Sequence, residues 1–381
     1  MRNTQLVLFS DTVYDLNGVS RFLNDFAKIG EKSNFSIITS TKKSAFSQKK
    51  NIYNINPYFK ISMPFYKELD LVFPNPFKMA KLLKQLSPTL IHISTPGPVG
   101  LIGSILAKIY KIPKAGIYHT DFPQYIYKNS NSKFFKYISK TYLRFFYRDF
   151  EAIFVRSDEY KNIIINDLKI HEKKIFTLKA GIDTKNFSSS FRNTDIWNNY
   201  RIKTSTLKFL YVGRVTKEKN IKFLIQLFKE ISLLSTNIDL IIVGNGEFLK
   251  YKDELKKNNI YFLGAKGGDE LSKIYASSDV FIFPSTTDTL GQVVLEAMCS
   301  GLPVIVTNEG GPKEFVKLAN SGFILDIKNK DMWIEAIMKL KEDKNLQKEY
   351  SQNANSFMLH NDIKNSFDDF CLKNRLICSK R

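Results

Sequence analysis

The chain has 381 residues, of which 43% are hydrophobic and 25% charged, a composition that excludes extensive disorder and fibrous repeats and predicts about two globular domains. The formal net charge is +20, and it is uneven: residues 1–185 carry 29 Lys and Arg against 14 Asp and Glu, whereas residues 186–381 carry 28 against 23. A basic first half suggests an anionic partner, either a nucleic acid, a membrane surface or a phosphorylated substrate. A lysine-rich composition typical of an AT-rich genome is the alternative explanation for most of the excess, but it does not explain the asymmetry.

Several other classes of protein are not expected. No apolar run approaches the roughly 18–20 residues that span a bilayer, and the N-terminal run LVLF is too short for the core of a signal peptide. The cysteines Cys299, Cys371 and Cys378 have no paired spacing, which fits a reducing compartment rather than a disulfide framework. The four histidines are scattered, so neither a metal site nor a cofactor is predicted.

Strand-like apolar runs alternate with helical segments along nearly the whole chain, which predicts α/β units with parallel sheets. A polar stretch at 183–206 is the expected linker between two doubly wound domains. In such sheets ligands bind beyond the carboxyl ends of the strands, so functional residues are expected at strand-to-helix turns. The expected strands are 6–10, 35–40, 90–94, 115–120 and 152–157 in the first half, and 208–214, 238–246, 260–265, 280–285, 303–308 and 322–326 in the second.

In the first half, the turns after the first and fourth strands contain candidate site residues. Gly18, in the segment Asn17-Gly18-Val19, opens a helix and is a possible anion cradle. His119 lies at a strand end beside Asp121, where a catalytic group is expected to project. A lone histidine is more often structural, but its place at a strand end favours the functional interpretation.

Residues 122–148 contain six basic residues and no acidic one. Four of the basic residues recur every four positions and form one stripe of a helix that is also rich in aromatic residues. A basic, aromatic amphipathic helix is typical of a surface for anionic lipid head groups, although an ordinary helix with its aromatic residues in the core is the alternative. The stripe consists of Lys136, Lys140, Arg144 and Arg148.

In the second half, the strand at 208–214 is followed by a basic turn. Arg214 comes directly after Gly213, and Lys219 follows five residues later. The two cations can hold a diphosphate, Arg through forked hydrogen bonds and Lys as a point charge. By itself the pattern is weak, because a basic turn is more often a solvated loop.

The segment 283–312 gives a sharper signal. Asp288 and Glu296 are eight residues apart and bracket the start of a helix near Gly291, where free N–H groups allow an anion to approach. Asp288 can accept hydrogen bonds from the hydroxyls of a sugar. Glu296 lies in an apolar helical sequence, VVLEAM, and is hard to explain as a surface residue; an ion pair with a buried cation is the alternative.

Three glycine turns complete the pattern of the second half. The turns at 244–246 and 264–266 each follow a strand, and their backbone groups could bracket a planar base, although such turns are common in α/β folds. The third, Gly310-Gly311-Pro312, either closes over a ligand or simply makes a turn.

Combined and in this order, the motifs resemble those of family 4 glycosyltransferases. That family has the GT-B fold, in which two Rossmann-like doubly wound domains face each other across a cleft and the last helix crosses back. The segments TPGPVGL and YHTDFPQY look most like the glycolipid-forming branch, which contains sulfoquinovosyl-diacylglycerol synthases and nucleotide-sugar-dependent α-mannosyltransferases. The resemblance is carried by NGV at 17–19, STPGPVGL at 94–101, YHTDFPQY at 118–125, GIDTKNF at 181–187, VGRVTKEKN at 212–220, YASSDVFIFPS at 275–285 and TDTLGQVVLEAMCSGLPV at 287–304.

The resemblance implies three parts: an acceptor-binding domain at 1–185, a nucleotide-sugar-binding domain at 186–355, and a helix at 356–381 that returns to the first domain. It also implies a retaining hexosyltransferase that needs no metal. The donor would be GDP-mannose, a UDP-hexose or a UDP-uronate. The acceptor would be a lipid such as diacylglycerol or a glycolipid, at the cytoplasmic face of the cell membrane.

Three alternatives to this function stay open. One is a GT-B sugar-nucleotide epimerase, which would need several catalytic carboxylates and histidines that the sequence does not place. A soluble, polysaccharide or lipopolysaccharide acceptor would use the same chemistry. A nucleic-acid-binding protein is disfavoured, because the chain lacks an Arg-rich patch or a recognisable reading module and Glu296 would be unexplained. The oligomeric state is not predicted.

The resemblance also implies roles for individual residues. The expected catalytic residues are His119, Arg214, Lys219 and Asp288. Of these, Arg214 and Lys219 hold the donor diphosphate and stabilise its departure, while Glu296 binds the ribose hydroxyls. The expected donor-binding residues are Gly18, Gly213, Arg214, Lys219, Gly244, Ala265, Lys266, Asp288, Leu290, Gly291, Gln292 and Glu296.

Two residues depart from the family's pattern. Asp288 stands where Glu is usual, and Gln292 where an apolar residue is usual. Both departures leave the identity of the donor open, but not the chemistry.

Overall fold

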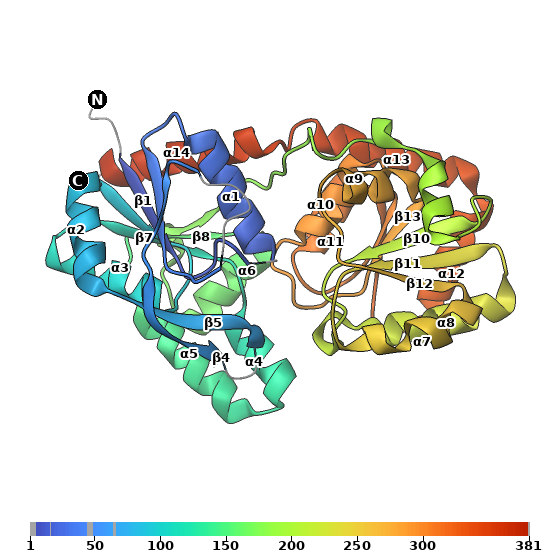
Figure 1. Cartoon of the computed structure of the whole chain (residues 1–381), viewed down its shortest axis with the longest axis horizontal. Coiled ribbons are helices and arrows are strands. Elements are labelled where there is room, and N and C mark those ends of the chain that lie inside the picture. Colours follow the sequence, from blue (N-terminus) through green and yellow to red (C-terminus); the bar gives the residue numbers. More distant parts are fainter. Residues whose placement is uncertain (1–4, 16, 44–48, 64–65, 380–381) are drawn as a thin grey trace. The chain divides into compact units, whose positions relative to one another are not determined.

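The computed structural model describes residues 5–15, 17–43, 49–63 and 66–379, and the chain divides into two compact units (Figure 1). The first unit consists of residues 1–181 and 363–381, and the second of residues 182–362. The boundaries expected from the sequence, after residues 185 and 355, lie near these division points.

A seven-stranded parallel sheet forms the centre of the first unit. Its strand order is β3-β2-β1-β6-β7-β8-β9, so the direction of winding reverses between β1 and β6, which pair directly. Beside the sheet lies an antiparallel hairpin of β4 (Pro57–Met63) and β5 (Tyr66–Pro74). The sheet strands are β1 (Leu6–Ser10), β2 (Phe35–Thr39), β3 (Ile52–Asn54), β6 (Leu90–Ile93), β7 (Lys114–Tyr118), β8 (Ala152–Val155) and β9 (Ile175–Thr177).

Helices cover this sheet because each has an apolar stripe that it buries against the strands. The C-terminal helix returns to this unit, as predicted: it packs on the first helix, where Phe26 meets Phe367 and Phe370 edge-on with ring centroids 5.2 and 5.4 Å apart. The helices are α1 (Gly18–Gly30), α2 (Pro76–Leu86), α3 (Pro98–Ile109), α4 (Phe122–Ser130), α5 (Lys133–Tyr147), α6 (Asp158–Ile163) and α14 (Ile363–Ser379).

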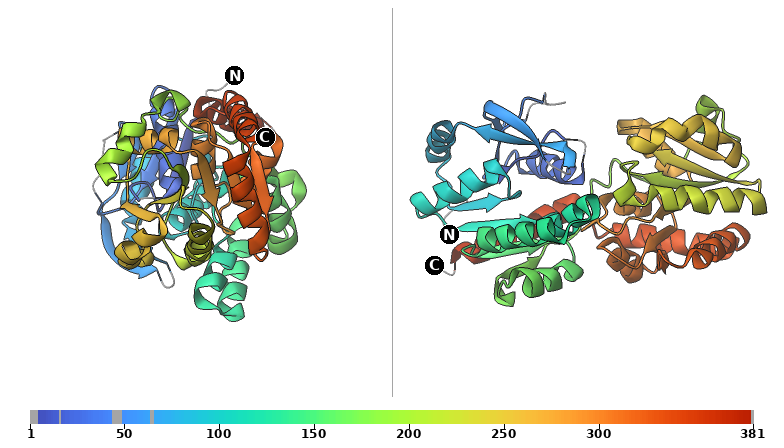
Figure 2. Two further views of the ribbon diagram at one scale, coloured as in Figure 1. Left: turned by 90° about the vertical axis from the view of Figure 1, so that its right-hand side faces the viewer. Right: turned by 90° about the horizontal axis from the view of Figure 1, so that it is seen from below.

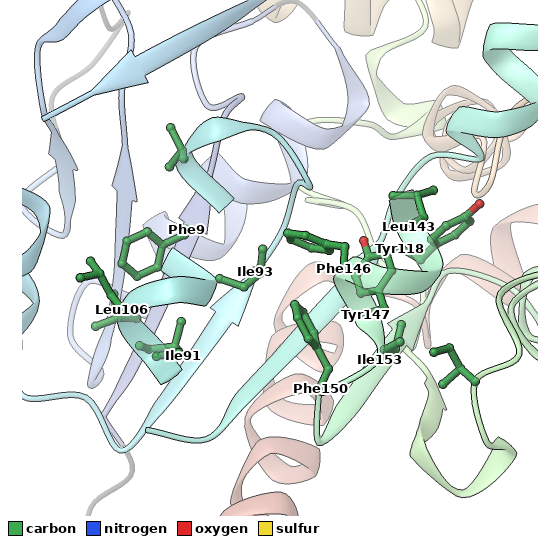
Figure 3. Packing of buried hydrophobic residues seen from close by; sticks show 14 of the residues in the cluster. Phe9, Ile91, Ile93, Leu106, Tyr118, Leu143, Phe146, Tyr147, Phe150 and Ile153 are labelled. Atoms are coloured by element: carbon green, nitrogen blue, oxygen red, sulfur yellow. The ribbon is translucent and has the colours of Figure 1, made fainter. Parts of the chain in front are cut away.

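A hydrophobic core cluster of the first unit joins β1, β6, β7 and β8 to helices α3 and α5 (Figure 3). Phe146 and Tyr147 of α5 and Phe150 beyond it form a group of mutually tilted rings with centroids 5.1–5.3 Å apart. One face of α5 is therefore anchored in the core.

The second unit contains a six-stranded parallel sheet in the order β12-β11-β10-β13-β14-β15. Its winding reverses between β10 and β13, which pair directly. All six predicted strands are present: β10 (Leu207–Val212), β11 (Ile238–Val243), β12 (Ile260–Gly264), β13 (Val280–Phe283), β14 (Val304–Thr307) and β15 (Gly322–Leu325). The helices are α7 (Ile221–Leu234), α8 (Lys252–Leu255), α9 (Gly268–Ser277), α10 (Gln292–Cys299), α11 (Pro312–Ala319), α12 (Lys330–Glu342) and α13 (Lys344–Met358).

The polar stretch at 183–206 is not a free linker, so this expectation was wrong. It belongs to the second unit and contains two 3₁₀ segments, Ser189–Phe191 and Thr194–Tyr200. Trp197 is 1% exposed, and its Nε1 donates to the carbonyl of Ser277. A polar composition hid the buried Ile-Trp pair that ties this stretch to the domain.

In the part of the chain that the structure describes, no helix is both long and apolar enough to cross a membrane. Within the same residues, no cluster of three or more His, Cys, Asp or Glu side chains has the geometry of a metal site. Cys299 and Cys371 are free thiols.

Candidate active site

The strongest candidate site lies at the carboxyl edge of the second unit's sheet. Arg214 and Lys219 follow β10, and Ser285 and Asp288 follow β13. Because β10 and β13 are neighbours at the point where the strand order reverses, these side chains converge where open α/β sheets bind ligands. The structure therefore brings together residues that are about 70 positions apart in the sequence.

Lys219 and Asp288 form a direct ion pair at this edge. Lys219 Nζ lies 2.6 Å from Asp288 Oδ2, and the Ser285 hydroxyl donates to the same oxygen at 2.5 Å. Burial would raise the pKa of Asp288, but the Lys219 charge and these hydrogen bonds outweigh it and lower the pKa below its ordinary value. Asp288 is consequently an ionised acceptor, fixed in place for hydroxyl donors.

Arg214 lies on the same turn, with its side chain 22% exposed. Its Nη2 is 3.1 Å from Glu218 Oε1, an i,i+4 pair, and Tyr211 donates its hydroxyl to the Arg214 carbonyl at 2.8 Å. The guanidinium is thus oriented while still reachable from solvent.

The N-terminus of α10 completes this edge. Gly291, the N-cap, has φ +70°, a left-handed conformation that favours glycine, and an added Cβ would lie 2.4 Å from Pro312 Cγ. The N-cap residue makes no side-chain hydrogen bond to this helix end, so its first N–H groups can serve an anion. The next two candidates flank Gly291: Leu290 is buried and Gln292 is partly exposed.

The Gly310-Gly311 turn lies against the same loop. The Gly311 amide donates to the Asp288 carbonyl at 2.9 Å, so this turn braces the loop that holds Asp288. Whether it also closes over a ligand stays a prediction.

Glu296 is fully buried in α10. Its Oε2 accepts a hydrogen bond of 2.9 Å from the Tyr275 hydroxyl, which comes from α9. The predicted contact with ribose stays a prediction. The sequence analysis did not single out Tyr275, which holds Glu296 in place. Its position at the start of the segment YASSD, shortly before the helix that contains Glu296, was a signal that could have found it.

The two glycine turns after β11 and β12 meet at this edge. Gly244 has φ +143°, and a Cβ there would lie 1.8 Å from the Gly213 carbonyl oxygen, so two loops approach as only glycine allows. Asn245 Oδ1 accepts from the Ala265 amide at 3.1 Å. Lys266 is paired with Glu270 at 2.9 Å, so its predicted contact with the donor competes with this ion pair.

The carboxyl edge of the first unit's sheet carries His119 after β7. Its Nε2 lies 2.9 Å from the Ser94 hydroxyl, at the end of β6. Burial, reinforced by the positive charge of Arg156, lowers the pKa of His119 well below its ordinary value, so the ring is neutral. Asp121 does not serve this histidine in the way that their sequence proximity suggested: it caps α4, accepting from the Gln124 amide and the Tyr118 hydroxyl.

Asp11 is a buried carboxylate that the sequence did not single out. Its Oδ1 accepts from the Val99 amide at 2.8 Å, and its Oδ2 accepts from the Thr95 hydroxyl at 2.6 Å. Asp11 therefore occupies the N-terminus of α3, next to the point where the first sheet reverses. Burial raises its pKa from the ordinary 3.8 to about 6, against the hydrogen bonds, which lower it.

The N-terminus of α1 is also capped by the chain itself. Gly18 is the first residue of α1 and is exposed, while Asn17 Oδ1 accepts from the Ser20 amide at 2.9 Å. The predicted approach of donor phosphates to Gly18 stays a prediction.

Helix α5 carries the predicted basic stripe, but the stripe is partly used inside the first unit. Lys140 forms an ion pair with Asp167, and Arg144 donates to the Asp167 carbonyl. Lys136 donates to Gln124 Oε1 at 2.8 Å, and Arg148 lies over the Phe145 ring. The aromatic residues divide: Phe146 and Tyr147 are in the core, whereas other apolar side chains of the helix are exposed, namely Phe134, Phe135, Tyr137, Ile138, Tyr142 and Phe145.

Comparison with known families identifies the chain. Residues 16–186 match the family described as Glycosyltransferase Family 4, and residues 193–357 match the family described as Glycosyl transferases group 1. The chain belongs to the family 4 glycosyltransferases. The fold and family expected from the motifs are therefore confirmed.

Curated relatives of this glycosyltransferase lie in the branch that the motifs indicated. It is 30% identical over 262 residues to a sulfoquinovosyl transferase of Arabidopsis thaliana, a match covering 66% of this chain and 49% of the relative. It is also 30% identical over 271 residues to a GDP-mannose-dependent alpha-mannosyltransferase of Corynebacterium glutamicum, covering 70% of this chain and 62% of the relative. The matches thus span about half to three fifths of these relatives.

A solved structure shows the same fold. The sucrose-phosphate synthase of Thermosynechococcus elongatus superposes with a TM-score of 0.79 at 15% identity, covering 99% of this chain and 100% of that one.

Proposed function

We propose that this glycosyltransferase moves a hexose from a nucleoside-diphosphate sugar to a lipid acceptor, with retention at the anomeric carbon and without a metal or cofactor. The observation that carries the proposal is the convergence of Arg214, the Lys219–Asp288 pair and the uncapped N-terminus of α10 at one sheet edge. Its positive groups suit a diphosphate, and Asp288 suits sugar hydroxyls. The names of the curated relatives support donors such as GDP-mannose.

In the proposed reaction, the bond between the anomeric carbon and the diphosphate oxygen breaks while the acceptor oxygen bonds to the same face of the sugar. The acceptor's proton passes to the departing phosphate. Arg214 and Lys219 stabilise the negative charge that grows on the diphosphate, a form of electrostatic catalysis that needs no protein nucleophile. His119, whose lowered pKa keeps its ring neutral, is a candidate substrate-binding residue of the first unit.

The lipid acceptor is supported by the outer face of α5. Viewed from below in Figure 2, this helix lies on the near side of the first unit. Phe134 is 66% exposed, Tyr137 69% and Phe145 68%, among basic side chains. Large aromatic groups rarely stand so exposed without a partner, and their combination with cations suits an anionic membrane surface. We propose that α5 holds the enzyme peripherally at the cytoplasmic face of the membrane.

The reaction is tested by incubating the full chain with radiolabelled GDP-mannose, UDP-glucose or UDP-glucuronate and diacylglycerol-containing vesicles. One donor is expected to give a labelled lipid, whose anomeric configuration by NMR matches that of the donor. Activity retained in EDTA is expected. Labelled product only with a soluble sugar or polysaccharide would replace the lipid acceptor with the alternative one.

Membrane binding is tested by sedimentation with phosphatidylglycerol vesicles. The double variant Tyr137→Ser/Phe145→Ser is expected to lose most of its binding. Phe77→Ser is the matched control, because Phe77 is an aromatic residue of the same unit, 83% exposed, on α2. Equal loss in both variants, or no binding by the wild type, would contradict the role of α5.

A further inference from the structure

The carboxyl edge of the first sheet has a charged residue that the site described above does not use. Ser94, His119 and Arg156 follow the neighbouring strands β6, β7 and β8, so they form a row along this edge. Arg156 Cζ and the His119 ring both pack against Phe22 of α1, 4.3 and 5.4 Å from its ring centroid. The side chains of Arg156 and His119 thus contact the same phenylalanine ring.

Arg156 is a buried cation that meets no counter-charge among the described residues. The residue is 3% exposed, and its Nη1 has no hydrogen-bond partner there. Within the residues that the structure describes, no hydrogen bond or ion pair reaches its guanidinium, which has only the face of Phe22. Burial without a compensating carboxylate lowers the pKa of Arg156 to about 9.

A buried unpaired guanidinium is strongly unfavourable, and a cation–π contact offsets only part of its desolvation. The carboxylates along this edge are already engaged: Asp11 at the N-terminus of α3 and Asp121 at that of α4. Asn17 likewise caps α1. An anion arriving at this edge would therefore find the helix ends capped and Arg156 as the cation that still lacks an acceptor.

We propose that Arg156 binds an oxyanion of the substrate, a phosphate, sulfonate or carboxylate group that docks beside His119. The fork of a guanidinium matches the paired oxygens of such groups, and burial strengthens the attraction. His119 as a whole residue is intermediate in exposure and shares the Phe22 contact with Arg156, so a group that docks on it comes next to the guanidinium. The proposal rests on the proposed function only for the assignment of this oxyanion to the donor or the acceptor.

The binding itself is tested with inorganic phosphate and no nucleotide. Thermal unfolding of the full chain is followed in phosphate and in chloride at equal ionic strength. Wild type is expected to gain about 3–5 °C at a phosphate concentration ten times the dissociation constant. Arg156→Met is expected to lose most of this gain, keeping only what phosphate bound at the open edge of the second unit contributes, while melting no lower than wild type without phosphate, because it removes an uncompensated charge.

Two further variants keep the test decisive. Arg156→Lys retains the charge without the fork and is expected to keep less than half of the gain. Arg375→Met removes an exposed charge from α14 of the same unit and is expected to keep all of it. A wild type without a phosphate-specific gain would overturn the proposal. So would an Arg156→Met variant that melts several degrees lower but responds normally.

The source of the oxyanion is separated by donor titrations. If the oxyanion belongs to the donor sugar, Arg156→Met lowers the affinity for UDP-glucuronate at least tenfold and leaves the affinity for UDP-glucose unchanged. If it belongs to the acceptor, both donors bind as in wild type. Failure of every nucleotide sugar to bind, with the phosphate response intact, would remove the proposed function and leave the oxyanion site standing.

Discussion

The two units have closely similar strand orders but differ in what occupies the carboxyl edge of the sheet. In the first unit, Asp11 fills the N-terminus of α3 at the reversal point. In the second unit, the corresponding helix, α10, follows the N-cap Gly291, which makes no side-chain hydrogen bond to it, beside the Lys219–Asp288 pair. At the reversal point, the helix N-terminus is therefore occupied by the chain's own carboxylate in one unit and left open to an anion in the other.

This difference shows that strand order alone does not locate a ligand. Both sheets have a reversal point. In the first unit, however, the positive end of the α3 dipole is already occupied by the carboxylate of Asp11. What distinguishes the second is a free helix end accompanied by cations that the chain holds in place. Substitutions at each edge can break or sharpen this contrast.

The largest effect is expected from Lys219→Ala. Loss of the cation that faces Asp288 should lower kcat by about 10²–10³-fold, because the departing diphosphate loses electrostatic stabilisation. The measurement is the steady-state rate of glycosyl transfer. Lys217→Ala is the matched control, since Lys217 lies in the same 3₁₀ turn, Lys217–Lys219, and is exposed. Equal rates for the two variants would contradict the role of Lys219.

Asp11→Asn tests the sealed edge. Because the folded pKa of Asp11 is about 6 and the ordinary value is 3.8, the folded state binds the proton more tightly. The stability of wild type relative to the variant should thus be greatest below about pH 4 and fall by up to about 3 kcal/mol as the pH rises to 7. Urea unfolding at several pH values measures it. Asp331→Asn, at an exposed position, is the control and should show no such change with pH. If Asp11→Asn also shows no change with pH, the carboxylate of Asp11 is well solvated and the prediction is contradicted.

His92→Gln tests how α14 is held on the first unit. His92 Nε2 lies 2.9 Å from Asn374 Oδ1, and burial lowers the pKa of His92 from 6.5 to about 3. The unfolded state binds the proton more tightly, so wild type should lose about 2 kcal/mol relative to the variant as the pH falls from 6.5 to 5. His171→Gln, at an exposed position, is the control for urea unfolding. A constant difference between wild type and His92→Gln would refute the buried neutral ring.

Tyr275→Phe is expected to have the smallest effect. It removes the hydroxyl that holds Glu296 and should weaken donor binding by about 5–10-fold, equivalent to about one hydrogen bond. Calorimetric titration of the donor measures this change, with Tyr251→Phe, at an exposed position, as control. Unchanged donor affinity together with lowered stability would assign Tyr275 a purely structural role.

Much of the fold was predictable, because buried parallel strands are continuous apolar runs and turn chemistry marks their ends. The predicted strands missed β3 and β9, three residues each, and the hairpin β4–β5. The candidate residues of the second unit were found because cations and carboxylates follow the strands directly. Asp11, Arg156 and Tyr275 escaped detection because their significance lies in partners, or the lack of them, far away in sequence.

The central claim is that the open edge of the second unit binds a nucleoside diphosphate. The most direct test is calorimetric titration of UDP, GDP and ADP into wild type, Arg214→Ala and Lys217→Ala. One nucleotide should bind wild type and Lys217→Ala alike and bind Arg214→Ala at least tenfold more weakly. No binding by any of the three nucleotides, or equal affinity in Arg214→Ala, would contradict the account.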